Sequence, residues 1–349
     1  MKPRVLLGMS GGIDSSVAAM LLIEQGFEIV GITFLFSDVN NSDETTVNDA
    51  KKLAEKLKIK HIVVDLRVLF KDTVITYFKG EYIAGRTPFP CAYCNPNVKF
   101  AQLQKYAEIE NCDFIATGHY VQIKSYRGKK FIFRGKDNDK DQSFFLWGLS
   151  QKLIEKLIFP LGNYDKQTVK KLAKEKGFLS LANKKESLGI CFIEGNNYRK
   201  FLKSEGIISK PGLFIDTKGN VLGKHKGITN YTIGQRRGLG LHLNYPVFVA
   251  KFLLNENKIV LGNYAELYKN RLIIKDYKIL DNELVNNGAE LIVRVRYRLQ
   301  ETPCNLNILN DERAEVVLLK SEAMIANGQT AVFYDGDRLV GGGFIESSE

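Results

Sequence analysis

A glycine-rich turn between a buried strand and an apolar helix constrains this chain more than any other feature. Residues 4–7 read as a short buried strand, and residues 17–22 open an apolar helical pattern. The turn between them runs Gly8-Met9-Ser10-Gly11-Gly12-Ile13-Asp14-Ser15-Ser16. Its backbone N–H groups and the positive end of the helix point at one place, so the segment predicts an anion site. Gly11 and Gly12 allow close approach of the backbone. Four side chains are expected to cap the helix: Ser10, Asp14, Ser15 and Ser16.

The turn differs from the commoner triphosphate-binding pattern, G-x-x-x-x-G-K-[ST], because it has no lysine. It matches S-G-G-x-D-S and resembles the pyrophosphate loop of the ATP pyrophosphatases. That resemblance implies cleavage of ATP between its α and β phosphates, which yields an adenylated substrate and pyrophosphate. An isolated glycine pair would indicate only a turn. The strand before the turn and the helix after it favour the nucleotide site.

Strands and helices alternate through the first part of the chain. Residues 26–35 and 60–65 read as buried strands, and residues 49–57 and 68–79 read as helices. This alternation predicts an α/β fold with a doubly wound parallel sheet. Ligands of such sheets bind at the carboxyl ends of the strands. Phe34, at the end of the second strand, is either an adenine-stacking residue or a core aromatic.

The following segments mix loops, one further strand and short helices. Three prolines between residues 85 and 97 predict an irregular loop. Further along the chain we expect a helix at 98–109, a buried strand that runs into Gly118 and His119, a hairpin at 121–134, and helices at 144–149 and 165–176. His119 is more typical of a satisfied structural group than of a site residue.

The pattern changes near residue 205, where glycines and short β-like runs replace the helices. We therefore predict three parts: an ATP-pyrophosphatase (adenylation) domain over 1–204, a small central domain over 205–269, and a C-terminal all-β barrel over 270–349.

The charge of the chain favours a polyanionic partner. Fifty lysines and arginines against 39 acidic residues give a net charge of +11, which suits nucleic acid but also serves solubility alone. No apolar run reaches the length of a membrane span and no signal peptide is visible. We therefore expect a cytoplasmic protein without membrane contact.

Five cysteines are present, and an odd number in such a chain argues against a disulfide framework. Cys91 and Cys94 form a C-x-x-C pair, and Cys94 and Cys191 both fall in segments that the fold would bring near the phosphate site. A thiolate is a strong nucleophile, and Lys99 and Arg86 lie near Cys94 in the sequence. The two others, Cys112 and Cys304, are expected to be inert and buried.

Matches spread along nearly the whole chain resemble the tRNA-specific 2-thiouridylases of bacterial type. They include the first loop, residues 85–100, 116–120, 140–145 and 186–193, and the later segments Tyr231–Gly240, Val295–Arg298 and Gly328–Gly336. The family replaces the 2-oxygen of the wobble uridine of tRNA with sulfur. The resemblance implies that ATP adenylates this oxygen, which makes it a good leaving group.

The resemblance also implies a nucleotide site, two catalytic thiols and a tRNA surface. ATP, with Mg²⁺, would bind Gly8, Met9, Ser10, Gly11, Gly12, Ile13, Asp14, Ser15, Phe34 and Gly118. Cys191 would carry a persulfide from a sulfur donor such as a cysteine desulfurase or a sulfur-relay protein. Cys94 would act as nucleophile, or release the sulfur by forming a disulfide bond with Cys191. The tRNA contacts would be Phe89, Pro90, Cys91, Lys140, Asp141, Gln142, Arg296, Tyr297 and Arg298.

Cys91 departs from the family pattern, in which many members have aspartate at this position. Three cysteines at 91, 94 and 191 provide an alternative mechanism, in which they bind a 4Fe–4S cluster whose fourth iron binds sulfide. Cys91 could equally be an accidental replacement. Two other functions stay open from the sequence: another pyrophosphate-loop synthetase acting on a small molecule, and a non-catalytic RNA-binding protein with a degenerate ATP site.

Overall fold

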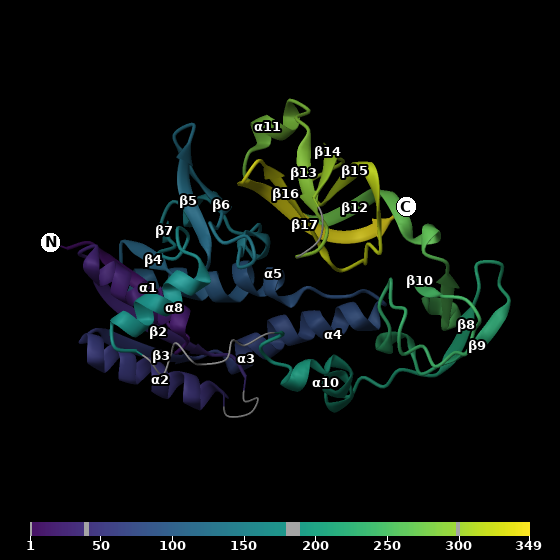
Figure 1. Ribbon diagram of the computed structural model, residues 1–349, viewed down its shortest axis with the longest axis horizontal. Helices are drawn as coiled ribbons and strands as arrows, with labels where there is room; N and C mark the ends of the chain where they lie inside the picture. Colours follow the sequence, from purple (N-terminus) through teal and green to yellow (C-terminus); the bar gives the residue numbers. More distant parts are fainter. Residues whose placement is uncertain (1, 38–41, 179–188, 298–300) are drawn as a thin grey trace. The chain divides into compact units, whose positions relative to one another are not determined.

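The computed structural model describes residues 2–37, 42–178, 189–297 and 301–349. The chain divides into two compact units, whose elements are labelled in Figure 1. The first unit comprises Met1–Val74, Cys91–Asn196 and Asp337–Leu339; the second comprises Ile75–Pro90, Asn197–Gly336 and Val340–Glu349. Within the described ranges, no helix is long and apolar enough to cross a membrane.

A five-stranded parallel sheet forms the centre of the first unit, in the order β3-β2-β1-β4-β7. All four neighbouring pairs are parallel. The strand order reverses between β1 and β4, which makes the carboxyl end of β1 a topological switch point. The predicted doubly wound α/β fold is therefore confirmed. The strands are β1 Arg4–Gly8, β2 Glu28–Leu35, β3 Lys60–Asp65, β4 Phe114–Ala116 and β7 Leu157–Ile158.

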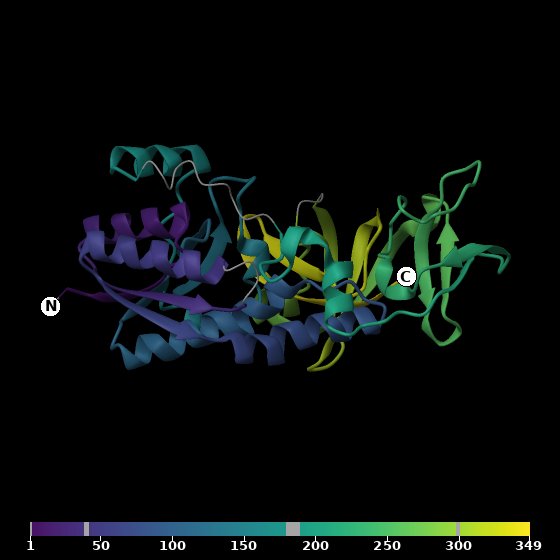
Figure 2. The ribbon, with the colours of Figure 1, turned by 90° about the horizontal axis from the view of Figure 1, so that it is seen from below.

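Helices cover both faces of this sheet. Figure 2 shows α1 (Ile13–Glu24) and α2 (Ser42–Leu57) on one side and α6 (Phe100–Ile109) on the other. Helix α8 (Lys166–Glu175) packs against α1, and Val169 and Ala173 join the apolar core of α1, β1 and β2. Burial of this shared core fixes the position of the loop between β1 and α1.

The cysteine segment contains a helix that the sequence reading missed. Residues 85–97 were expected to be irregular, but α5 (Pro90–Cys94) and a π-helical turn (Asn95–Lys99) lead directly into α6. Proline is favourable at the start of a helix, because its φ angle is already helical and its missing N–H has no partner there. The irregular stretch therefore ends at Pro90, which is the first residue of α5.

One further helix prediction was right and another was wrong. Residues 68–79 are helical throughout, although a π-helical turn, Lys71–Ile75, interrupts the α-helical pattern between α3 (Arg67–Phe70) and α4 (Thr76–Ile83). The expected helix at 144–149 is only a 3₁₀ turn, Ser143–Phe145. There the carboxylate of Asp141 accepts hydrogen bonds from the Ser143 backbone N–H (3.1 Å) and hydroxyl (2.9 Å), which favours a compact loop.

The predicted hairpin is present as β5 (Val121–Tyr126) and β6 (Lys129–Arg134). Its turn residues, Arg127 and Gly128, have φ angles of 48° and 76°. Two successive positive φ angles match the twist of a two-residue hairpin.

The second unit contains two β structures, as predicted for the C-terminal part of the chain. A four-stranded sheet has the order β10-β11-β8-β9. Six further strands follow the order β12-β15-β14-β13-β16-β17, and the β12–β17 pairing closes them into a barrel. The strands are β8 Gly212–Ile215, β9 Val221–His225, β10 Phe248–Leu253, β11 Lys258–Gly262, β12 Tyr268–Ile279, β13 Leu291–Arg294, β14 Thr302–Ile308, β15 Arg313–Ala323, β16 Thr330–Asp335 and β17 Arg338–Ser348.

The second unit also contains α4 and the short helices α10 (Tyr198–Ser204) and α11 (Asn282–Asn286). The rings of Tyr82 in α4 and Tyr198 in α10 stack at 4.7 Å. The proposed boundaries at 204/205 and 269/270 remain a prediction.

Candidate functional site

The loop after β1 exposes the amino end of α1 as the sequence predicted, but its serines do not cap the helix. Gly12 is the N-cap residue, and it has no side chain that could accept a hydrogen bond from the first turn of the helix. The hydroxyls of Ser15 and Ser16 instead donate to the Gly12 carbonyl (3.2 and 2.8 Å), and the Ser10 backbone N–H donates to Ser15 Oγ (3.1 Å). The capping prediction was therefore wrong. The first N–H groups of α1 are left for an anion.

Gly11 has a conformation that only glycine adopts easily here. Its φ is +61°, and a Cβ would lie 2.6 Å from the Thr46 carbonyl oxygen. The tight turn of the loop therefore depends on this residue.

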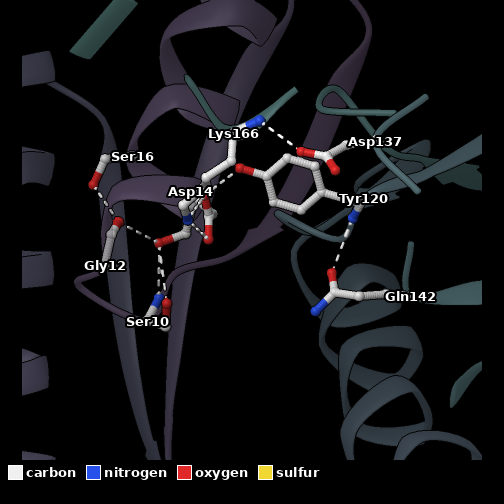
Figure 3. Close-up of polar contacts among 9 residues, drawn as sticks. Ser10, Gly12, Asp14, Ser16, Tyr120, Asp137, Gln142 and Lys166 are labelled. Atoms are coloured by element: carbon white, nitrogen blue, oxygen red, sulfur yellow. Dashed lines mark hydrogen bonds and ion pairs between the residues drawn. The ribbon is translucent and has the colours of Figure 1, made fainter. Parts of the chain in front are cut away.

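Asp14 of the loop is held by two residues from other elements, as Figure 3 shows. Lys166 Nζ lies 2.7 and 2.8 Å from the two carboxylate oxygens of Asp14, and the Tyr120 hydroxyl donates to Oδ1 at 2.6 Å. Lys166 is the first residue of α8, and its backbone N–H donates to Asp137 Oδ2 (2.9 Å). The sequence reading missed both Lys166 and Tyr120.

Replacement of Lys166 by methionine is expected to destabilise the first unit. The change leaves the half-buried Asp14 carboxylate, whose side chain is 35% exposed, with the Tyr120 hydroxyl but without its cation. We expect the free energy of unfolding to fall by about 1 kcal/mol, because the carboxylate loses its charged partner while solvent screens part of the effect. Urea denaturation measures this difference. Lys171→Met is the control, because the Lys171 side chain is 77% exposed; equal stability of both variants would contradict the expectation.

A cavity of about 340 Å³ opens beside the loop. Seven of the predicted ATP residues line it: Gly8, Met9, Ser10, Asp14, Ser15, Phe34 and Gly118. Three others do not, namely Gly11, Gly12 and Ile13, and Ile13 packs into the apolar core. The lining also includes residues that had no nucleotide role in the sequence reading, among them Phe36, Lys99, His119 and Gln142. The cavity therefore joins the carboxyl ends of β1, β2 and β4.

Aromatic rings form one wall of this cavity. The ring of Phe34 lies 5.8 Å from Phe36 and 6.3 Å from Tyr106. Phe34 therefore belongs to an aromatic cluster and also borders the cavity, so both of its predicted roles stay open. His119 is a neutral group at physiological pH, because burial lowers its pKa to about 3. The Thr117 hydroxyl lies 2.7 Å from His119 Nδ1.

A second hollow, of about 410 Å³, lies in the second unit along the loop between residues 236 and 247. It contains none of the residues predicted to bind ATP or to carry sulfur. Most of the residues predicted to bind ATP line the cavity beside the first loop instead.

Three thiols lie close enough to influence one another. Cys91 and Cys94 are one helical turn apart on α5, and both raise the pKa of the Cys191 thiol. Desolvation is the main cause in each case: it raises the pKa of Cys94 to about 11 and that of Cys191 to about 12, and it also raises the pKa of Cys91. Cys191 is exposed as a residue, so solvent partly offsets this effect. All five cysteines are free thiols.

The thiols do not fit the iron–sulfur alternative. In the described ranges, which include Cys91, Cys94 and Cys191, no group of three cysteine, histidine or acidic side chains is placed to hold a metal ion.

The residues predicted to touch tRNA lie in both units. In the first unit, Asp141 is buried and accepts hydrogen bonds from the backbone N–H groups of Gly135 and Ser143, so it orders its own loop. Gln142 accepts a hydrogen bond from the Tyr120 backbone N–H (2.9 Å) and lines the cavity beside the first loop, and Lys140 is half-buried. These three contacts with tRNA remain predictions.

Cys91, the fourth predicted tRNA contact in the first unit, also remains a prediction, and the second unit carries the other five. Pro90 is buried, whereas Phe89 and Tyr297 are half-buried. Burial lowers the pKa of Arg296. Arg298 lies outside the described residues. The roles of these five residues remain predictions.

Comparisons with known proteins cover the whole chain. Residues 3–195 match the family described as the tRNA methyl transferase HUP domain, residues 199–263 the tRNA methyl transferase PRC-barrel domain, and residues 269–345 the aminomethyltransferase beta-barrel domain. Among solved structures, a 4-thiouridine synthetase in an RNA complex with bound ATP matches 58% of this chain and 50% of that chain. Its sequence identity is 18% and its TM-score 0.36, a likeness too weak to argue from.

The curated relatives are far more similar. A protein named tRNA-specific 2-thiouridylase MnmA 2 from Phocaeicola vulgatus is 45% identical over 98% of this chain and 97% of its own length. A protein named tRNA-specific 2-thiouridylase MnmA from Halothermothrix orenii is 41% identical over 99% of both chains. Identity at this level extends over nearly the whole chain. The chain therefore belongs to the tRNA-specific 2-thiouridylase family.

Proposed function

We propose that this protein is an ATP-dependent enzyme that replaces the 2-oxygen of the wobble uridine of tRNA with sulfur. One observation carries the proposal: a single short segment contributes both to the pair of thiols and to the lining of the nucleotide cavity. Residues 91–99 contain Cys91 and Cys94 on α5 and, five residues after Cys94, Lys99 in the lining of the nucleotide cavity. A thiol pair joined to an adenylation site is what sulfur transfer to an activated oxygen needs.

The first half of the reaction would activate the uridine. The phosphates of Mg²⁺-ATP bind at the free amino end of α1, and the adenine lies toward Phe34. The uridine 2-oxygen attacks the α phosphorus, and pyrophosphate leaves. Carbon 2 then carries a good leaving group, AMP, in place of a poor one.

The second half would transfer sulfur from Cys191. A sulfur donor first loads Cys191 as a persulfide. In one order of events, the terminal sulfur attacks carbon 2 and AMP leaves with the original oxygen. The thiolate of Cys94 attacks Cys191 Sγ, which breaks the S–S bond to the transferred sulfur and forms a Cys94–Cys191 disulfide. In the other order, Cys94 attacks first and releases hydrosulfide, which then attacks carbon 2. Both orders oxidise two thiols, so an external thiol must reduce the disulfide before the next turnover.

The test is reconstitution with purified components. The protein, Mg²⁺-ATP, cysteine, a cysteine desulfurase and an unmodified tRNA transcript with a wobble uridine should yield 2-thiouridine, measured by nucleoside mass spectrometry. One AMP and one pyrophosphate should appear per thiouridine. The same transcript with cytidine at the wobble position is the matched control.

Other outcomes would identify the rivals. Cleavage of ATP without tRNA, together with no thiouridine, would favour a synthetase for a small molecule. Binding of tRNA with no release of AMP or pyrophosphate would favour a non-catalytic RNA-binding protein. Either result contradicts the proposed function.

A further inference from the structure

Lys99 connects the nucleotide cavity with the thiols. It is the last residue of the π-helical turn Asn95–Lys99, which follows the C-x-x-C helix α5 directly. Its side chain is half-buried and lines the cavity together with Ser10, His119 and Gln142. π-Helical turns are often found at functional sites, because they widen the helix and redirect a side chain.

Lys99 is also the cation that acts on the thiols. Its positive charge opposes the effect of burial on the pKa of Cys91, Cys94 and Cys191 alike. Its backbone N–H also forms a hydrogen bond with Cys94 that favours the thiolate. The same charge contributes to keeping His119 neutral.

An anion bound in the cavity would require a positive charge among the lining residues. The phosphate loop has no lysine of its own, and Lys166 is engaged with Asp14. His119 is neutral, so Lys99 is the cation among the residues that line the cavity. Within the described part of the chain, no carboxylate forms an ion pair with Lys99. A half-buried lysine without an acidic partner, facing an anion site, is placed to bind a phosphate.

We propose that Lys99 is a shared cation, which binds a phosphate of the nucleotide and stabilises the thiolates of Cys94 and Cys191. The proposal rests on the proposed function for its biological meaning. A bound polyphosphate and a thiolate compete for one positive charge, so each weakens the other. Departure of pyrophosphate then frees the charge for the thiols. This order activates sulfur only after the uridine has been adenylated.

Two assays on the whole protein test the shared charge without tRNA or a sulfur donor. The first is the affinity for α,β-methylene-ATP with Mg²⁺, measured by calorimetry. The second is the rate of iodoacetamide alkylation of Cys94 and Cys191 at pH 8, followed by peptide mass spectrometry with and without that analogue. Lys99→Met and Lys99→Gln remove the charge, Lys99→Arg keeps it, and Lys171→Met removes a charge from the exposed face of α8.

We expect Lys99→Met and Lys99→Gln to lower the affinity for the ATP analogue about tenfold. The same variants should slow alkylation of both thiols about tenfold, which corresponds to a rise of one unit in the pKa of each thiol. Lys99→Arg should retain most of both properties, and Lys171→Met should match the original protein. The analogue should slow alkylation in the original protein and have less effect in Lys99→Met.

Unchanged nucleotide affinity or unchanged alkylation in both neutral variants would overturn the proposal. The experiments distinguish failure of the shared-cation proposal from failure of the proposed function. Thiouridine formation with no effect of Lys99 would refute the shared cation alone. Coupling through Lys99 without thiouridine formation would refute the proposed substrate alone.

Discussion

Cys94→Ser and Cys191→Ser are each expected to reduce tRNA thiolation by roughly a thousandfold or more. A serine hydroxyl at 191 cannot carry a persulfide, and one at 94 can neither attack a persulfide nor form a disulfide. Both losses should appear as absence of 2-thiouridine in the reconstituted reaction. Both variants should still bind Mg²⁺-ATP, because neither side chain lines the nucleotide cavity.

The pH dependence of thiol reactivity gives this expectation a second readout. Burial raises the pKa of Cys94 to about 11 and that of Cys191 to about 12, so both thiols are mostly protonated at neutral pH. Raised pKa values mean that the thiolate fraction grows about tenfold per pH unit below them. The alkylation rate of both residues should therefore rise from pH 7 to pH 9 without levelling off. A plateau near pH 8 would contradict the argument from burial.

The matched controls are the two cysteines outside the site. Cys112 and Cys304 are both buried, and Cys304 lies in the barrel core. Cys112→Ser and Cys304→Ser should keep thiolation. Cys304→Ser places a hydroxyl in the apolar barrel core and costs some stability, whereas the Cys112 thiol already donates to the Glu110 carbonyl (3.8 Å). Thiolation that survives Cys94→Ser and Cys191→Ser would point instead to an enzyme that needs no cysteine pair.

Cys91 separates the two mechanisms considered from the sequence. It is not needed to carry or release sulfur in the persulfide route, so Cys91→Ser should keep measurable activity. A cluster held by three cysteines would lose a ligand and its activity in the same variant. The structure, in which the three thiols are not placed to hold a metal ion, favours the first outcome.

The sequence predicted the fold around the first loop well, because a local pattern determines the backbone there. The strand, the S-G-G-x-D-S turn and the helix lie in consecutive residues, and the parallel sheet follows from alternating strands and helices. Gly118 and Phe34 could be predicted to lie near this loop because each follows or ends a buried strand, and parallel strands bring their carboxyl ends to one edge of the sheet.

The remaining parts of the site depend on tertiary contacts, which leave no local pattern. Lys166 is 152 residues from Asp14 and stands in no motif, and Tyr120, at the end of the matching segment 116–120, is 106 residues away. The failed capping prediction has a related cause. Ser15 and Ser16 bond back to Gly12 within the helix, a competition that residue type alone does not resolve. The helix at Pro90 was missed because proline signals both a loop and a helix start.

Gly118→Ala is expected to disable the nucleotide site while it leaves the rest of the first unit folded. A Cβ at residue 118 would lie 2.9 Å from Asp14 C, 2.9 Å from Ser15 N and 3.2 Å from Asp14 Cβ. Two of these atoms are backbone at the start of α1, so they cannot rotate away as the tip of a side chain could. Either β4 or the phosphate loop must therefore shift by several tenths of an ångström.

Such a shift should affect ATP chemistry more than stability. We expect the affinity for Mg²⁺-ATP to fall at least about tenfold, and tRNA-dependent pyrophosphate release to fall about a hundredfold, because small displacements of reacting groups are costly. The free energy of unfolding should fall by only about 1–3 kcal/mol. Calorimetry, a pyrophosphate assay and urea denaturation measure the three quantities.

Gly80→Ala is the control for the added methyl group. Gly80 lies within α4, and a Cβ there meets no atom within 4 Å. Alanine is the better helix former, so this variant should keep full activity and gain up to about 1 kcal/mol of stability. Full ATP affinity in Gly118→Ala would show that the loop can yield to a methyl group. The close approach of residue 118 to the start of α1 would then be a packing detail, and the nucleotide site would not depend on it.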